Sequence, residues 1–235
     1  MIERAFNEAL LHKGNKKDAL REFAISQARH ILQAAGVVDP AIKDHGVAVK
    51  PEESVEKPFY MIPEGEVVKF IQEIGGKSAE QLEAEVKSTG REVTIYASDS
   101  IHSPKFEVLD EVTPQELAKF PVRALRFRGN PTTRQLYEKI PQTRCRIDGE
   151  EYILELPRAE VGPHKAIADK DQALNDWYYV MHEPITGRHG DPGVFEVGRN
   201  SDGRFLYGPW ASPDDRWAPD DQLVVALRKL ESVKP

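Results

Sequence analysis

Seventeen prolines divide this chain of 235 residues into short segments, and they constrain its fold more than any other feature. Proline cannot donate a backbone hydrogen bond and its ring clashes with the preceding helical turn, so it ends helices and stays at the margins of sheets. Prolines make up about 7% of the chain, against a usual ~5%. We therefore expect a loop-rich fold of short elements and no long coiled coil.

The overall composition is that of a globular protein. Hydrophobic residues make up 40% before the 16 glycines are counted, which excludes wholesale disorder. No stretch approaches the roughly 20 apolar residues of a membrane helix, and the acidic Glu3 and Glu8 do not fit a signal peptide. Cys145 is the only cysteine, so no internal disulfide can form. We expect a soluble, cytoplasmic protein without a membrane partner.

The first third of the chain predicts a helical hairpin followed by a linker. Apolar residues recur at helical spacing on both sides of a break at Gly14–Asn15, which indicates a hairpin over residues 1–36. Residues 37–58 contain Pro40 and Pro51 and read as a linker or extended arm. The apolar stripes of the hairpin need a cover, either from the rest of the chain or from a partner.

Residues 59–142 predict a mixed α/β region. A helix should start at Pro63 and stop at Gly75–Gly76, and a second should run from Ser78 to Gly90. The apolar residues of Arg91–Ala97 alternate with polar ones, as in a half-buried strand.

The second half of this region contains further short elements. The spacing of Thr113 and Glu116 is that of a capping box, which predicts a helix to about Lys119. Apolar and basic residues alternate over residues 121–128, as in a strand with one solvent-exposed face. A short helix should follow over Thr132–Ile140.

Residues 143–235 predict a β-rich region that continues the preceding one as a single domain. The Asp148–Gly149 pair fits a type I′ hairpin turn, and a second hairpin should join VFEV to RFLY across GRNSDG. Residues 222–230 could be a strand or a short helix, and their β-branched content favours the strand. The expected fold class is α+β, with an N-terminal helical hairpin, a mixed middle and an antiparallel β-rich end.

Charge is distributed unevenly along the chain, although its net value is only −7. Residues 120–147 carry seven basic side chains and one acidic one, whereas residues 37–119 and 148–235 are strongly acidic. The basic side chains are Arg123, Arg126, Arg128, Arg134, Lys139, Arg144 and Arg146. Guanidinium groups interleaved with aromatic residues predict a site for nucleic acid or an acidic partner. The alternative is that they pair with the acidic segment 37–119 in the same fold or with an acidic partner subunit.

A second candidate site lies in the loop around residue 189. His182, His189 and Asp191, with Glu183 beside them, bring imidazole and carboxylate groups within ten residues, a set that suits zinc or iron. The spacing matches no ligand pattern that fixes metal geometry, so a solvated loop is the alternative.

No complete catalytic signature is present. The chain lacks the G-x-S-x-G elbow, the phosphate loop GxxxxGK[ST] and GxGxxG, so we predict no catalytic residues and no cofactor. On a strand, Cys145 would point away from Arg144 and Arg146, which indicates a small buried hydrophobe rather than a nucleophile.

Three functional hypotheses follow from these observations. The first is a non-enzymatic assembly or protein–protein interaction protein that binds a protein partner or forms a homo-oligomer. The second is a metal-dependent hydrolase or nuclease that uses His182, His189 and Asp191. The third is an accessory protein that binds nucleic acid through arginines 123–146.

Overall fold

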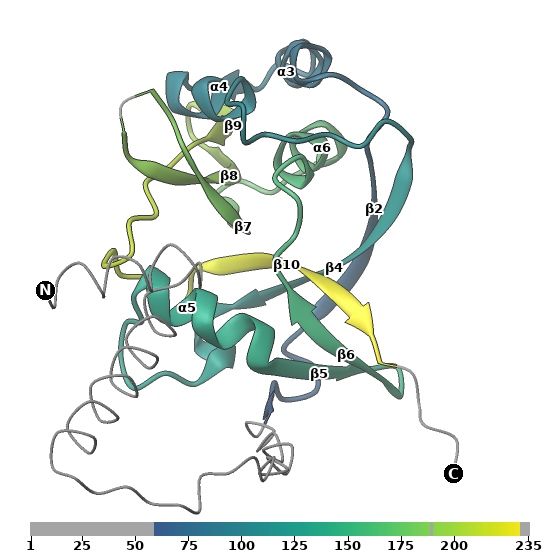
Figure 1. Ribbon diagram of the computed structural model, residues 1–235, viewed down its shortest axis with the longest axis vertical. Helices are drawn as coiled ribbons and strands as arrows, with labels where there is room; N and C mark the ends of the chain where they lie inside the picture. The colour runs from purple at the N-terminus through teal and green to yellow at the C-terminus, as the bar shows by residue number, and fades with distance from the viewer. Residues whose placement is uncertain (1–58, 189, 231–235) are drawn as a thin grey trace, which may run out of the picture. The chain divides into compact units, whose positions relative to one another are not determined.

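A computed structural model describes residues 59–188 and 190–230, which form a mixed α+β fold (Figure 1). The helical hairpin predicted for residues 1–36 and the linker predicted for 37–58 lie outside the described residues. Within the described ranges, none of the helices combines the length and apolarity that crossing a bilayer requires.

The described residues contain one sheet of ten strands, four α-helices and two short 3-10 helices. The helices are α3 (Ala79–Ser88), α4 (Ile95–Ile101), α5 (Thr133–Lys139), α6 (Val161–Ala168), η1 (Val122–Leu125) and η2 (Ile140–Gln142). The strands are β1 (Tyr60–Met61), β2 (Val68–Ile74), β3 (Glu92–Val93), β4 (Thr113–Pro121), β5 (Thr143–Ile147), β6 (Glu150–Glu155), β7 (Asp176–Thr186), β8 (Pro192–Asn200), β9 (Gly203–Tyr207) and β10 (Gln222–Lys229).

Strand β10 is the centre of the sheet. Its first half pairs antiparallel with β4 and parallel with β7, and its second half pairs antiparallel with β6. Ala226 has Leu117 of β4 as one partner and Glu155 of β6 as another. From this strand the sheet extends through β6, β5 and β1 in one direction, through β7, β8, β9 and β3 in another, and through β4 to β2.

Two hydrophobic clusters lie on opposite faces of β10. Leu223, Val225 and Leu227 belong to one cluster, whereas Val224 and Ala226 belong to the other. This division follows from the two-residue period of a strand, which sends successive side chains to opposite faces. In Figure 1, α5 lies beside the first cluster with β5 and β6, and α3, α4 and α6 lie with β7, β8 and β9 around the second.

The structure confirms both predicted hairpins. Strands β5 and β6 pair antiparallel across Asp148 and Gly149, whose φ angles of 52° and 81° are the positive values of a type I′ turn. Strands β8 and β9 pair up to Asn200 and Gly203, as predicted for the second hairpin. Residues 222–229 form a strand, which resolves the choice between strand and helix.

Two predicted helices are wrong, because each segment is a strand. The segment after Pro63 forms β2, and the segment after Thr113 forms β4; the two strands pair over seven residues. The helix was predicted from local spacing, but a spacing of four residues places Phe70 and Ile74 on the same face of a strand as well as on the same face of a helix. Pairing with a distant segment decides between these readings, and one sequence window cannot show it.

Two predicted strands are also largely wrong. Only Glu92 and Val93 of Arg91–Ala97 form a strand, because the Thr94 side chain caps α4 by accepting from the Ala97 amide. Residues 121–128 contain η1 and a turn in which Arg126 has a φ of 52°. The helices predicted from Ser78 and Thr132 are confirmed as α3 and α5, both with capping boxes.

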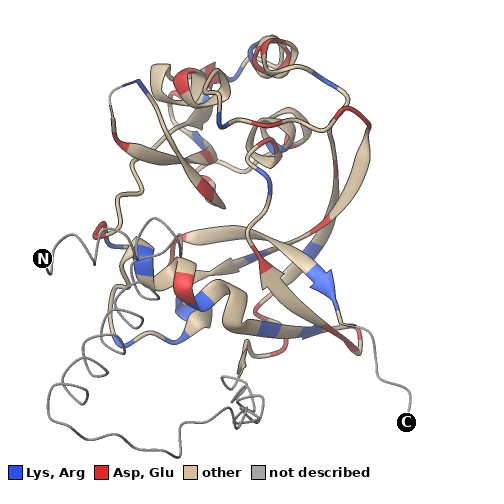
Figure 2. Cartoon of the chain, viewed as in Figure 1, with Lys and Arg blue, Asp and Glu red and all other residues tan. Residues whose placement is uncertain are grey.

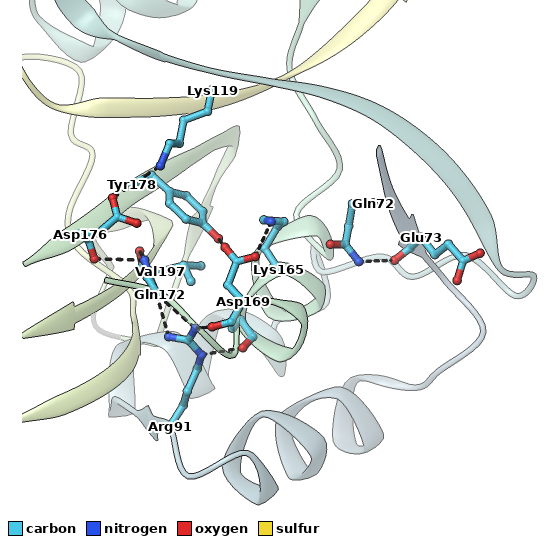
Figure 3. Close-up of polar contacts among 11 residues, drawn as sticks. Gln72, Glu73, Arg91, Lys119, Lys165, Asp169, Gln172, Asp176, Tyr178 and Val197 are labelled. Carbon is cyan, nitrogen blue, oxygen red and sulfur yellow. Dashed lines mark hydrogen bonds and ion pairs between the residues drawn. The ribbon is translucent and has the colours of Figure 1, made fainter. Parts of the chain in front are cut away.

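Arg91 links several elements of the second cluster through a buried guanidinium group (Figure 3). The side chain donates to the carbonyls of Ala166, Asp169 and Gly198, at 2.5, 2.5 and 3.0 Å, and to the Gln172 side chain. Only 3% of the residue is exposed. Arg91 therefore fixes the end of α6 and the loop after it against β8 through several charge-assisted hydrogen bonds.

Replacing this guanidinium should destabilise the protein strongly. Lysine keeps the charge but has three donors on a flexible stem, so Arg91→Lys leaves buried carbonyls without partners and should lower the free energy of unfolding by about 2–4 kcal/mol. Urea denaturation measures this difference. The exposed Arg228→Lys exchange is the control, with an expected change under ~0.5 kcal/mol. Equal effects of the two substitutions would contradict the structural role of Arg91.

Candidate functional site

Three of the seven basic side chains of residues 120–147 form ion pairs. Arg123 contacts Asp220 at 2.5 Å, Arg134 contacts Asp214 at 3.4 Å, and Arg146 contacts Glu151 at 2.5 Å. All three carboxylates belong to the acidic segment 148–235 rather than to 37–119. These exposed pairs neutralise part of the positive charge within the protein itself.

The other four basic side chains have no carboxylate within ion-pair distance in the described part of the chain. They are Arg126, Arg128, Lys139 and Arg144. Figure 2 shows Lys and Arg along α5, β5 and the turn that precedes α5, the region to which these four belong. The structure thus leaves a cationic surface there, which we call the α5 surface.

A cleft of about 450 Å³ opens at this surface. It is lined by Tyr60, Phe127, Gln135, Glu138, Lys139 and Gln142, and we call it the α5 cleft. Tyr60 reaches it because β1 pairs parallel with β5, and the Tyr60 hydroxyl donates to the Ala124 carbonyl at 3.0 Å. Phe127 follows the left-handed residue Arg126, which turns the chain after η1.

Cations lie directly against the aromatic rings of the site. The Lys139 ammonium is 4.2 Å from the centre of the Tyr60 ring and 4.6 Å from that of Phe127. The Arg144 guanidinium lies 3.5 Å from the centre of the neighbouring Phe59 ring. These are cation–π contacts, and partial burial lowers the pKa of Lys139.

Two side-chain amides add hydrogen-bonding groups to the cleft. The Gln135 carbonyl oxygen accepts from the Thr132 amide, and the Gln142 amino group donates to the Glu138 carbonyl. Within the described ranges, the other polar atom of each side chain makes no hydrogen bond, which leaves a donor on Gln135 and an acceptor on Gln142. The cleft can therefore offer charge, flat apolar rings and directional hydrogen bonds together.

Sequence reasoning assigned Arg126, Arg128 and Arg144 to a binding site. It did not assign Lys139 to that site, and it missed Phe59, Tyr60, Gln135 and Gln142. Phe59 and Tyr60 lie about 60 residues before the basic segment, and only the β1–β5 pairing brings them to it. A sequence pattern did indicate a role for Gln135, since it is the third residue of α5 and completes the capping box that begins at Thr132.

The structure describes two of the three proposed metal ligands, His182 and Asp191. His182 is 1% exposed; its Nδ1 lies 2.7 Å from the Glu183 carbonyl and its Nε2 accepts from the Phe195 amide. Burial lowers its pKa to about 4. Both ring nitrogens serve the fold, so His182 would have to give up a hydrogen bond to bind a metal.

His189 is outside the described residues, and Asp191 lines a small pocket with Asp99, Tyr96 and Trp210. Within residues 59–188 and 190–230, no group of three or more metal-ligating side chains gathers.

Cys145 lies buried on β5, as the strand reading predicted. Burial raises the pKa of its thiol to about 11, so the thiolate that nucleophilic attack requires is disfavoured at neutral pH.

Glu196 is a perturbed carboxyl outside the α5 cleft that sequence reasoning did not identify. It lies on β8 between Tyr179 of β7 and Tyr207 of β9, its direct partners in the sheet. Burial raises its pKa to about 7, and the nearby charge of Asp221 adds to the shift. No local sequence pattern indicates this environment, because it depends on the register of three strands.

The raised pKa of Glu196 makes stability depend on pH. Between an unfolded pKa near 4.5 and the folded value near 7, the folded state binds more protons, so this group lowers stability as the pH rises. Glu196→Gln should leave stability unchanged at pH 4 and raise the free energy of unfolding by about 1–2 kcal/mol at pH 8. This value is smaller than the pKa shift alone implies, because Glu196 is partly exposed to solvent. Urea denaturation across this range tests it, with the exposed Glu64→Gln as control; a pH-independent difference would contradict it.

Comparison of the chain with protein-family models, with curated proteins and with solved structures finds no match in any of the three.

Proposed function

We propose that this protein is a non-enzymatic binding protein and that the α5 surface binds nucleic acid. The observation that carries the proposal is that cations with no carboxylate partner in the described part of the chain lie on exposed and half-buried aromatic rings. The Lys139 ammonium contacts the rings of both Tyr60 and Phe127, and the Arg144 guanidinium lies on the Phe59 ring.

The division of the basic residues supports an anionic ligand. Arg123, Arg134 and Arg146 already have acidic partners, so binding a phosphate would require them to exchange one partner for another. Arg126 and Arg128 are exposed and have no such partner among the described residues. A phosphate would therefore gain the attraction of these two guanidinium groups without breaking an ion pair.

The aromatic rings favour nucleic acid over an acidic protein. Carboxylates on a protein surface need only cations, whereas nucleic acids combine phosphates with flat bases that stack on aromatic side chains. The net charge of −7 restricts such binding to this surface, because the rest of the chain would repel a polyanion.

Removing the two unpaired arginines should weaken binding more than removing paired ones. Arg126→Ala with Arg128→Ala should lower the affinity for a fluorescein-labelled 20-nucleotide DNA strand at least about 10-fold at 50 mM salt. The slope of log affinity against log salt should fall by about 1 for each lost phosphate contact. Fluorescence anisotropy measures both quantities.

The matched control is Arg123→Ala with Arg134→Ala, which removes the same charge from the same segment. It should change the affinity less than about threefold, because these side chains are held by Asp220 and Asp214. Equal losses for the two double variants would indicate only a diffuse charge effect. If the unaltered chain binds poly-glutamate but no nucleic acid at low salt, the partner is an acidic protein and the proposal is rejected.

A second candidate function, protein assembly, is favoured by a separate apolar patch. Ile95 and Tyr96 at the start of α4 are 60% and 44% exposed, and Trp210 is 60% exposed. The rings of Tyr96 and Trp210 meet edge to face with their centres 6.4 Å apart. Exposed aromatic residues grouped in this way are typical of protein interfaces.

If this patch mediates self-association, polar substitution should abolish it. Ile95→Ser with Trp210→Ser should convert an oligomer to a monomer. Size-exclusion chromatography with light scattering, at a protein concentration of about 100 µM, measures this change. Val68→Ser with Ile71→Ser is the control, since these residues are equally exposed on β2. A chain that is already monomeric before substitution would exclude self-association through this patch.

A further inference from the structure

The Lys139 ammonium lies against two aromatic rings, and we call the space that it occupies the slot. It lies 4.2 Å from the centre of the Tyr60 ring and 4.6 Å from the centre of the Phe127 ring. The two ring centres can therefore be no farther apart than the sum of these distances, about 9 Å. A flat ring sandwiched at van der Waals contact, ~3.5 Å from each neighbour, needs a spacing of about 7 Å. This upper limit allows one planar ring to lie between the two side chains.

Lys139 can leave this slot at low cost. It is the last residue of α5, it has no carboxylate partner among the described residues, and its side chain is a flexible four-carbon stem. Partial burial disfavours its charged form where it now lies. Moving the ammonium out to a phosphate would restore its solvation, and the vacated space would receive a planar ring.

The edges of the cleft carry the groups that a nucleobase needs. Gln135 and Gln142 line it, and each has one amide atom available for a ligand, a donor and an acceptor. Nucleobases present both acceptors and donors along their edges. The volume of about 450 Å³ falls within the range of small-molecule sites and exceeds what one base needs.

We infer that the α5 cleft holds one unpaired nucleobase between Tyr60 and Phe127, so that the nucleic acid it binds is single-stranded. This inference rests on the proposed function. In a duplex each base is already stacked and paired, and inserting one between two protein rings would first require its extrusion. Arg126, which directly precedes Phe127 in the chain, would then contact the phosphate attached to the bound base.

The inference predicts a preference that charge alone cannot produce. The full-length chain should bind a 20-nucleotide dT strand at least about 10-fold more tightly than a 20-base-pair duplex and than a strand of equal length and charge that has abasic sugars. Phosphate charge is the same in the two single strands, so the difference between them reports the bases.

Substitutions of Phe127 test the slot directly. Phe127→Leu keeps an apolar side chain but removes the flat ring, and it should weaken dT binding about 10-fold while leaving abasic binding unchanged. Phe127→Trp restores a flat ring and should restore binding. Its indole fluorescence should be quenched by dT but not by the abasic strand, which shows stacking and keeps the test valid if the leucine variant fails to fold. Leu174→Ala, on a distant exposed residue, is the control.

The outcomes separate this inference from the function on which it rests. If both strands bind equally and Phe127→Leu has no effect, while Arg126→Ala with Arg128→Ala still weakens binding, the base slot is wrong and nucleic-acid binding stands. If the duplex binds as tightly as dT, the single-strand preference is overturned. If no nucleic acid binds at low salt, the proposed function itself falls.

Discussion

The pairing of β10 along both edges is the constraint on which the rest of the structure depends. This strand contacts β4, β6 and β7, and its alternating side chains enter two separate hydrophobic clusters. Val224 is fully buried on one face and Val225 on the other. A polar residue at either position would open a cluster, and a shift of one residue in register would exchange the two faces.

The two hydrophobic clusters differ in what they support. The one around α3, α4 and α6 is fixed by Arg91, whose guanidinium satisfies carbonyls from several elements at once. The other supports the α5 cleft, because the buried Leu136 and Ile140 anchor α5 and its end while Lys139 remains at the surface. The position of the candidate ligand site thus follows from packing beneath it, as expected for a binding site on a rigid scaffold.

Much of the local structure could be predicted from the sequence, and the reasons are physical. The turn at Asp148 and Gly149 needs two positive φ angles, which few residue pairs tolerate, and the caps of α3 and α5 satisfy amides within three residues. The strands β2 and β4 could not be predicted, because their pairing over a long connection outweighs the helical spacing of each segment. In the site, the sequence showed the cations as a cluster of basic residues. Only the fold showed which of them contact a carboxylate among the described residues and which do not.

The sequence by itself determined an α+β chain of short elements, two hairpins and a basic segment between acidic ones, because these follow from residues close together in the chain. Tertiary structure alone decided that His182 lies in the core with both ring nitrogens engaged, and that Phe59 and Tyr60 meet Arg144 and Lys139. The cation–π contacts join residues far apart in sequence. Their energies depend on strand pairing and burial, which no local pattern encodes.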